Sequence, residues 1–120
     1  MAHYVDGFIF PIPKRNYAAY RRMTKLGAKV SMDHGALEYR ECIADDVKLG
    51  KLTSFPQSVK LKANEVVWLS WIAYKSRKDR DRINAKVMKD PRLAKLMDPK
   101  NLPFDGKRMI FGGFKVVVSR

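Results

Sequence analysis

The chain has 120 residues and a formal net charge of +13, from 25 lysine and arginine residues against 12 acidic residues. Its hydrophobic content of 46% is too high for a disordered chain, so we expect one globular domain spanning residues 1–120. The single cysteine, Cys42, excludes an internal disulfide and favours a cytoplasmic location. The apolar run that follows Asp6 is short and contains Pro11, which indicates neither a signal peptide nor a membrane span.

The first half of the chain changes from strand to helix and back to strand. Aromatic and β-branched residues over 4–12 predict a strand, and residues 14–33 have the apolar spacing of an amphipathic helix with a basic outer face. We expect His34 and Gly35 to end this helix, because glycine accepts the left-handed conformation common beyond a helix. Residues 36–44 predict a second strand with one polar side, which is typical of a sheet edge.

The strongest strand pattern lies in the second half of the chain. Residues 45–64 have weak periodicity and predict a long loop, with a short extended piece at 58–61. Residues 65–74 are apolar on both faces, so this strand should be central and covered on both sides. Strand alternation places Trp68 and Trp71 on opposite faces, one toward the helices and one toward a second sheet.

Two helical pieces are expected after this central strand. Ser76 and Asp79 resemble a capping box at the start of the first piece. Asp90 followed by Pro91 starts the second, since Asp caps well and proline suits a first helical turn. The residues that form the apolar side of the second piece are Leu93, Leu96 and Met97, and those that end it are Asp98 and Pro99.

The end of the chain predicts a turn and a last strand. Asp105 and Gly106 form a tight-turn pair, residues 108–119 predict the strand, and Gly112 and Gly113 indicate a β-bulge within it. The resulting element order predicts an α+β fold, a ferredoxin-like βαββαβ domain with an antiparallel sheet. Its helices cover one sheet face, so we expect a second protomer to cover the other by sheet-on-sheet packing, which makes a homodimer.

Several blocks of the sequence resemble one known family. The blocks are Val5-Asp6-Gly7-Phe8, His34-Gly35-Ala36-Leu37, Glu41-Cys42, Asp45-Asp46, Thr53-Ser54-Phe55-Pro56, Arg80-Asp81, Met88-Lys89-Asp90-Pro91-Arg92, and Pro103-Phe104-Asp105-Gly106-Lys107-Arg108-Met109-Ile110 with Gly112-Gly113-Phe114. They resemble the bacterial YbaA-like proteins, the family known as domain of unknown function 1428. The resemblance implies a dimeric α/β barrel, in which two ferredoxin-like protomers pack sheet against sheet, and it implies no activity. Members of the family are usually near neutral or acidic, so the large positive charge is a departure.

The basic residues raise the question of polyanion binding. Those in the predicted helical region are Arg77, Lys78, Arg80, Arg82, Lys86, Lys89, Arg92 and Lys95. They surround the predicted helix, are interrupted by acidic residues and have no stacking aromatic residues among them. We therefore expect a solvated basic face that attracts nucleic acid non-specifically at most.

The aromatic residues of the central strand have two interpretations. They either line an aromatic ligand pocket or simply pack in the core. Domains of this type commonly leave a small cavity between helices and sheet. Tyr39, Glu41, Trp71 and Arg108 would then supply the walls and polar groups of the pocket. Core packing is the simpler interpretation of the two tryptophans.

Three residues are candidate catalytic groups: His34, Glu41 and Arg108. His34 has an ordinary pKa near physiological pH, but a capping role at its helix end is the simpler interpretation. We expect the charged residues of the family blocks to form structural ion pairs that fix the fold; they are Asp6, Arg80, Asp81, Arg92 and Asp105. Two distant histidines and one cysteine match no metal-ligand spacing, so we expect no metal and no cofactor.

The sequence thus supports two functional hypotheses. The first is a homodimeric α/β barrel that binds a small apolar or aromatic ligand, with a cofactor-independent reaction as its enzymatic form. The second is a non-catalytic interaction or stress-associated module whose dimer surface is the functional part. A closed, fully packed interior would count against the first hypothesis.

Overall fold

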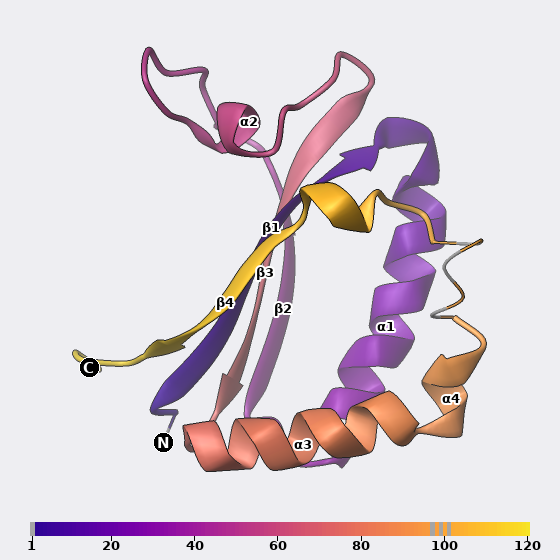
Figure 1. Ribbon diagram of the computed structural model, residues 1–120, viewed down its shortest axis with the longest axis vertical. Helices are drawn as coiled ribbons and strands as arrows, with labels where there is room; N and C mark the ends of the chain where they lie inside the picture. Colours follow the sequence, from indigo (N-terminus) through magenta and orange to yellow (C-terminus); the bar gives the residue numbers. More distant parts are fainter. Residues whose placement is uncertain (1, 97, 99, 101) are drawn as a thin grey trace.

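The computed structural model describes residues 2–96, 98, 100 and 102–120. Four antiparallel strands form one sheet in the order β2-β3-β1-β4, so the fold is α+β (Figure 1). The strands are β1 (Tyr4–Pro13), β2 (Glu38–Ile43), β3 (Glu65–Tyr74) and β4 (Ile110–Lys115). The helices are α1 (Tyr17–Asp33), α2 (Phe55–Ser58), α3 (Arg77–Lys89) and α4 (Pro91–Ala94), with 3₁₀ turns at Lys14–Asn16 and Gly106–Arg108.

The two inner strands of the sheet are β3 and β1, which pair along their full lengths from Tyr4↔Tyr74 to Pro13↔Glu65. The range of β3 is the one that its uninterrupted apolar pattern predicts, and its interior position confirms the prediction of a central strand. The half-polar strand β2 lies at an edge of the sheet, again as predicted.

The helices α1 and α3 lie on one side of the sheet, at a wide angle to each other, with α4 near their junction (Figure 1). Each contributes to a separate buried cluster. Tyr20 of α1 packs with Phe10 and Trp68, and Ile83 of α3 packs with Tyr4 and other residues at the opposite end of the sheet. The core is therefore two clusters rather than one continuous layer.

The other face of the sheet is not covered by α1 or α3. Among the described residues only the short helix α2 borders it, where Phe55 lines surface recesses together with Leu69 and Ile110. Alternation along the strands gives this open face Leu69 and Trp71 of β3 and Ile110 and Phe114 of β4. Leu69 is 37% exposed, Ile110 45% and Phe114 63%. Large apolar side chains thus face outward across the middle and one edge of the sheet. Among the described residues, no helix combines the length and the apolar character needed to cross a membrane.

The helix ends follow the capping predictions. Gly35 has φ +117°, the left-handed conformation expected after α1. The Ser76 side chain accepts from the Asp79 backbone N–H at the start of α3, and Asp90 accepts from the Arg92 N–H at the start of α4. Met97 and Pro99, which the sequence places at the end of this second helical piece, lie outside the described residues.

The expected extended piece at 58–61 is wrong. The Ser54 side chain accepts from the Gln57 N–H and Pro56 lies in the first turn, so the chain begins a short helix, α2, at Phe55. The bulge expected at Gly112 and Gly113 is also wrong, because both residues stay in register with β1. β4 ends at Lys115, opposite Tyr4, where its partner strand begins.

The glycine at 113 is required by a close approach rather than by a bulge. A Cβ atom built there would lie 2.8 Å from ring atoms of the buried Tyr4. A Cβ atom at Gly112 would meet only Phe114, at 3.8 Å.

We therefore expect Gly113→Ala to lower the free energy of unfolding by about 1–3 kcal/mol, because the buried Tyr4 ring must move to admit the methyl group. Gly112→Ala, the matched control on the same strand, should change stability much less. Chemical denaturation of both variants measures the difference, and equal stability of the two would contradict the steric explanation.

Candidate functional site

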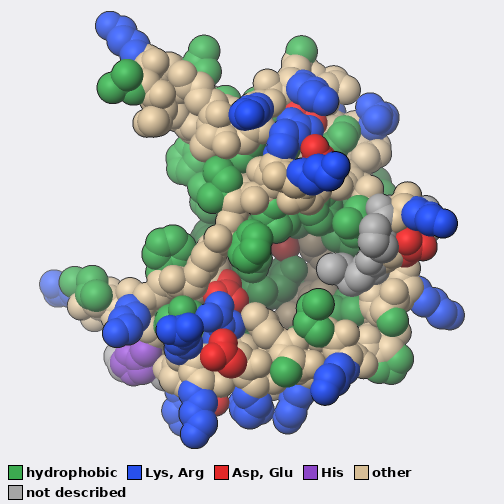
Figure 2. Space-filling view, viewed as in Figure 1, with side chains coloured by type: hydrophobic (Ala, Val, Ile, Leu, Met, Phe, Trp, Pro, Cys, Tyr) green, Lys and Arg blue, Asp and Glu red, His purple; other side chains and the backbone are tan. Residues whose placement is uncertain are grey.

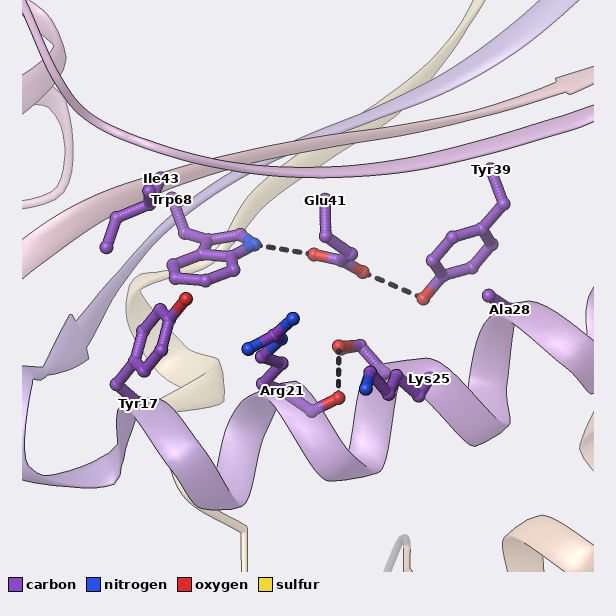
Figure 3. A pocket seen from close by; sticks show the side chains of 9 residues that line it. Tyr17, Arg21, Lys25, Ala28, Tyr39, Glu41, Ile43 and Trp68 are labelled. Atoms are coloured by element: carbon purple, nitrogen blue, oxygen red, sulfur yellow. Dashed lines mark hydrogen bonds between the residues drawn. The ribbon is translucent and has the colours of Figure 1, made fainter.

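A divided cavity separates α1 from the sheet. Its inner hollow, of about 280 Å³, is mostly apolar and is lined by Phe8, Phe10, Met23, Ile72, Val87 and Phe104 among others. Figure 2 shows hydrophobic side chains around a hollow on this side of the molecule. Its outer recess, of about 290 Å³, is lined by Tyr17, Arg21, Lys25, Ala28, Ile43 and Trp68 (Figure 3). Thr24, Tyr39 and Glu41 line both compartments.

Glu41 lies where the two compartments meet, and it lines both of them. Its Oε1 accepts hydrogen bonds from the Tyr20 hydroxyl at 2.8 Å and the Trp68 indole N–H at 2.7 Å. Its Oε2 accepts from the Tyr39 hydroxyl at 2.8 Å (Figure 3). In the described part of the chain no cation lies within ion-pairing distance of Glu41, so neutral donors alone satisfy it.

Burial raises the pKa of Glu41 above its ordinary value of 4.5, although the three hydrogen bonds partly oppose this effect. Burial, together with the Glu41 carboxylate, also raises the pKa values of Tyr20 and Tyr39 well above 10.0. The two phenols therefore stay protonated and act as fixed donors. Glu41 is the group at this site whose ionisation burial shifts to higher pH.

Local sequence periodicity places these side chains. Because side chains alternate along β2, Tyr39 and Glu41 both point to the helix-covered face of the sheet. On α1, three- and four-residue steps direct Tyr20, Met23 and Gly27 toward the inner hollow. A Cβ atom at Gly27 would lie 3.5 Å from the Tyr39 hydroxyl. The absence of a side chain at this position therefore leaves room for α1 beside Tyr39, which donates to Glu41.

Two residues expected in the pocket lie elsewhere. Trp71 is on the open sheet face, paired with Arg40, and its indole N–H donates to Glu38 at 2.8 Å. Trp68 is the tryptophan that faces the helices and contacts Glu41. The alternation separated the two indoles correctly, but only the position of the helices decides which one lines the site.

Arg108, the other expected pocket residue, forms a bidentate pair with the buried carboxylate of Glu65. It also donates to the Lys60 carbonyl and to Asp105. These bonds hold the pKa of Glu65 below its ordinary value and tie the 3₁₀ turn before β4 to the segment before β3. With its donors engaged in this way, Arg108 has a structural position apart from Glu41.

His34 also lies apart from the cavity, in a charged cluster at the end of α1. Its Nε2 is 2.8 Å from Oδ2 of Asp90, whose carboxylate also accepts from the Arg92 guanidinium and caps α4. Arg92 reaches Asp33 at 2.8 Å as well. The guanidinium of Arg92, followed by His34, lowers the pKa of Asp90. This cluster fastens α4 to the end of α1.

A second ion-pair cluster joins β1 to α3. Arg80 donates to the buried Asp6 at 2.6 Å and to Asp81 at 2.7 Å, and its guanidinium lies 5.0 Å from the centre of the Tyr4 ring. Burial raises the pKa of Asp6 against the opposing effect of Arg80. Among the described residues, no group of three His, Cys, Asp or Glu side chains converges in a way that could hold a metal ion.

The comparisons with known proteins agree with an α+β domain of this design. A family model described as "Protein of unknown function (DUF1428)" matches residues 3–106, and the chain belongs to this family. It is 45% identical over 116 residues to the uncharacterised protein YbaA of Escherichia coli K12, with 97% of each chain covered, and equally similar to the YbaA proteins of Escherichia coli O157:H7 and Shigella flexneri. The predicted family is therefore confirmed.

The fold also resembles a crystal structure of a NIPSNAP-family protein of unknown function from Agrobacterium tumefaciens. The TM-score is 0.54 at 16% identity, and the match covers 96% of this chain and 88% of the other. At this identity the likeness shows the fold alone. Any indication of function comes instead from the cavity around Glu41.

We expect the pKa of Glu41 to lie above 4.5, and the substitution Tyr39→Phe to raise it further by removing a donor that stabilises the carboxylate. Tyr17→Phe is the control, because Tyr17 lines the recess without a hydrogen bond to Glu41. The chain has three glutamates, so selective ¹³C labelling of their carboxyl groups gives three titrations, with Glu65 shifted in the opposite direction.

The raised pKa of Glu41 makes the free energy of unfolding depend on pH. Because the folded-state pKa of Glu41 exceeds that of the unfolded chain, its contribution is fully present below pH 4.5 and is lost as pH rises through the folded pKa. An NMR titration in which Glu41 has an ordinary or lowered pKa would contradict the burial argument.

Proposed function

We propose that this protein binds a small, mostly apolar or aromatic molecule in the inner hollow. The observation that carries the proposal is an apolar cavity of about 280 Å³ with the carboxyl group of Glu41 in its wall. Cavities that bind small molecules are typically apolar with a few fixed polar groups that orient the ligand. Tyr39 and Thr24 supply hydroxyl groups beside Glu41.

Glu41 gives the proposed site a chemical capability. Its Oε2 accepts one hydrogen bond, from Tyr39, and a carboxylate oxygen has capacity for a second. A raised pKa brings a carboxyl group closer to neutral pH, where it can both accept and donate a proton. A cofactor-independent reaction in the hollow would therefore be a proton transfer with Glu41 as the acid or base.

We further propose that two copies assemble through their open sheet faces into a dimeric α/β barrel of ferredoxin-like protomers. The order β2-β3-β1-β4 supports this arrangement, since it combines two βα units in one antiparallel sheet. Leu69, Ile110 and Phe114 give the face an exposed apolar surface. A second copy offers the same surface, so a two-fold interface would cover both at once.

The ligand proposal can be tested with the methionine methyl groups as reporters. Met23 and Met109 line the inner hollow, whereas Met32 and Met88 are exposed elsewhere. In a screen of small aromatic and apolar compounds by methyl NMR, a ligand of the hollow should shift the first pair and leave the second pair unchanged.

The substitution Gly27→Leu should abolish this binding, because its side chain projects into the hollow beside Tyr39. Gly27→Ala is the matched control, since its Cβ meets the Tyr39 hydroxyl at an ordinary 3.5 Å, and we expect it to stabilise α1 by about 0.5–1 kcal/mol. Compounds that bind Gly27→Leu as well as the wild type, or that shift all four methyl groups alike, would refute the site.

The dimer proposal predicts that Leu69→Glu produces monomers, because a charge in the centre of the paired faces must lose its hydration. Met88→Glu on α3, with a side chain 78% exposed in the wild type, is the control for the added charge. Sedimentation equilibrium distinguishes the two variants. A wild-type protein that is monomeric at tens of micromolar, or a Leu69→Glu variant that stays dimeric, would overturn the proposal.

A further inference from the structure

The outer recess has a different character from the inner hollow. Tyr17, Ile43 and Trp68 give it apolar and aromatic walls, and the rings of Tyr17 and Trp68 are 5.9 Å apart. Arg21 and Lys25 add two cationic side chains from α1 (Figure 3). The recess therefore combines a wall of two tilted aromatic rings with positive charge in a space of about 290 Å³.

The two cations of the recess have no acidic partner within 4.0 Å among the described residues. They are four residues apart on one helix, where like charges repel each other. Lys29, the next basic residue along this line, differs because it pairs with Asp33 at 3.5 Å. Glu41 forms no ion pair with Arg21 or Lys25, and its carboxylate accepts from phenol and indole donors instead.

We propose that the outer recess is a binding site for a small aromatic carboxylic acid, distinct from the ligand of the inner hollow. The ring of the acid lies against Tyr17 and Trp68, and its carboxylate lies between the Arg21 guanidinium and the Lys25 ammonium group. Glu41, at the back of the recess, repels the carboxylate of the acid. This repulsion turns the carboxylate toward the two cations.

Two independent features of the recess, its aromatic wall and its two cations, indicate the class of ligand. The aromatic wall alone would accept a neutral ring, and the cations alone would attract any anion from solution. A molecule that carries both a planar ring and one carboxylate satisfies both features. The volume of the recess restricts the ring to a small one, such as a single or fused bicyclic system.

The test uses 2-naphthoate and its neutral analogue 2-naphthamide at low salt. The chain has two tryptophans, so the indole N–H region of a ¹H–¹⁵N spectrum contains two signals. Trp68 lines the recess and Trp71 lies on the open sheet face, which makes Trp71 an internal control. The acid should shift the Trp68 signal in a saturable manner and leave the Trp71 signal unchanged, and the amide should bind at least about tenfold more weakly.

A pair of double variants separates local recognition from general attraction to a basic protein. Arg21→Gln combined with Lys25→Gln should weaken binding of the acid by about tenfold or more. Lys14→Gln combined with Arg22→Gln removes the same charge from residues that line neither compartment, and it should leave binding within about twofold of wild type. Lys14 and Arg22 thus serve as controls for net charge.

Each of the following results would overturn the inference. They are equal binding of the acid and the amide, equal loss of binding in the two double variants, and no shift of the Trp68 signal at millimolar naphthoate. These results are distinguishable from a failure of the inner-hollow proposal, because that site is monitored by the Met23 and Met109 methyl groups. Naphthoate that shifts those methyl groups instead of Trp68 would also refute the outer site.

Discussion

The carboxylate of Glu41 joins α1 to the paired strands β2 and β3 across the cavity. Its donors come from α1, from β3 and from its own strand β2, at 2.7–2.8 Å. A buried carboxylate without partners would be costly, so the three hydrogen bonds both remove that cost and fix the distance between helix and sheet. Because Tyr20 and Tyr39 remain protonated, both phenols stay available as donors to this carboxylate.

The inner hollow follows from that fixed distance and from the small residues that face it. α1 presents Thr24, Gly27 and Ser31 toward the interior, and β3 presents Ser70 opposite them. Larger apolar residues at these positions would fill the space and join the two buried clusters into one core. The fold instead packs tightly around Tyr20 and around Ile83, and stays open between them.

Features set by neighbouring residues could be predicted from the sequence, and features set by long-range contacts could not. The range of β3, the caps at Ser76 and Asp90, and the shared face of Tyr39 and Glu41 all depend on local periodicity or on side chains a few residues apart. The choice of Trp68 over Trp71 depends on which sheet face α1 occupies. The contact of Arg108 with Glu65 spans 43 residues of sequence, so no local pattern reveals it.

The positive charge of the chain divides into two parts with different physical roles. Arg80, Arg92 and Arg108 turn their guanidinium groups onto the buried carboxylates of Asp6, Asp90 and Glu65, with bidentate geometry at Arg92 and Arg108, which makes them part of the fold. Most other cations lie on outer helix faces, where water screens them and their effect on stability is small. Arg21 and Lys25 belong to neither group, because they stand unpaired beside an aromatic wall in a recess. Positive charge is there concentrated beside an aromatic wall, and the proposed acid site rests on this combination.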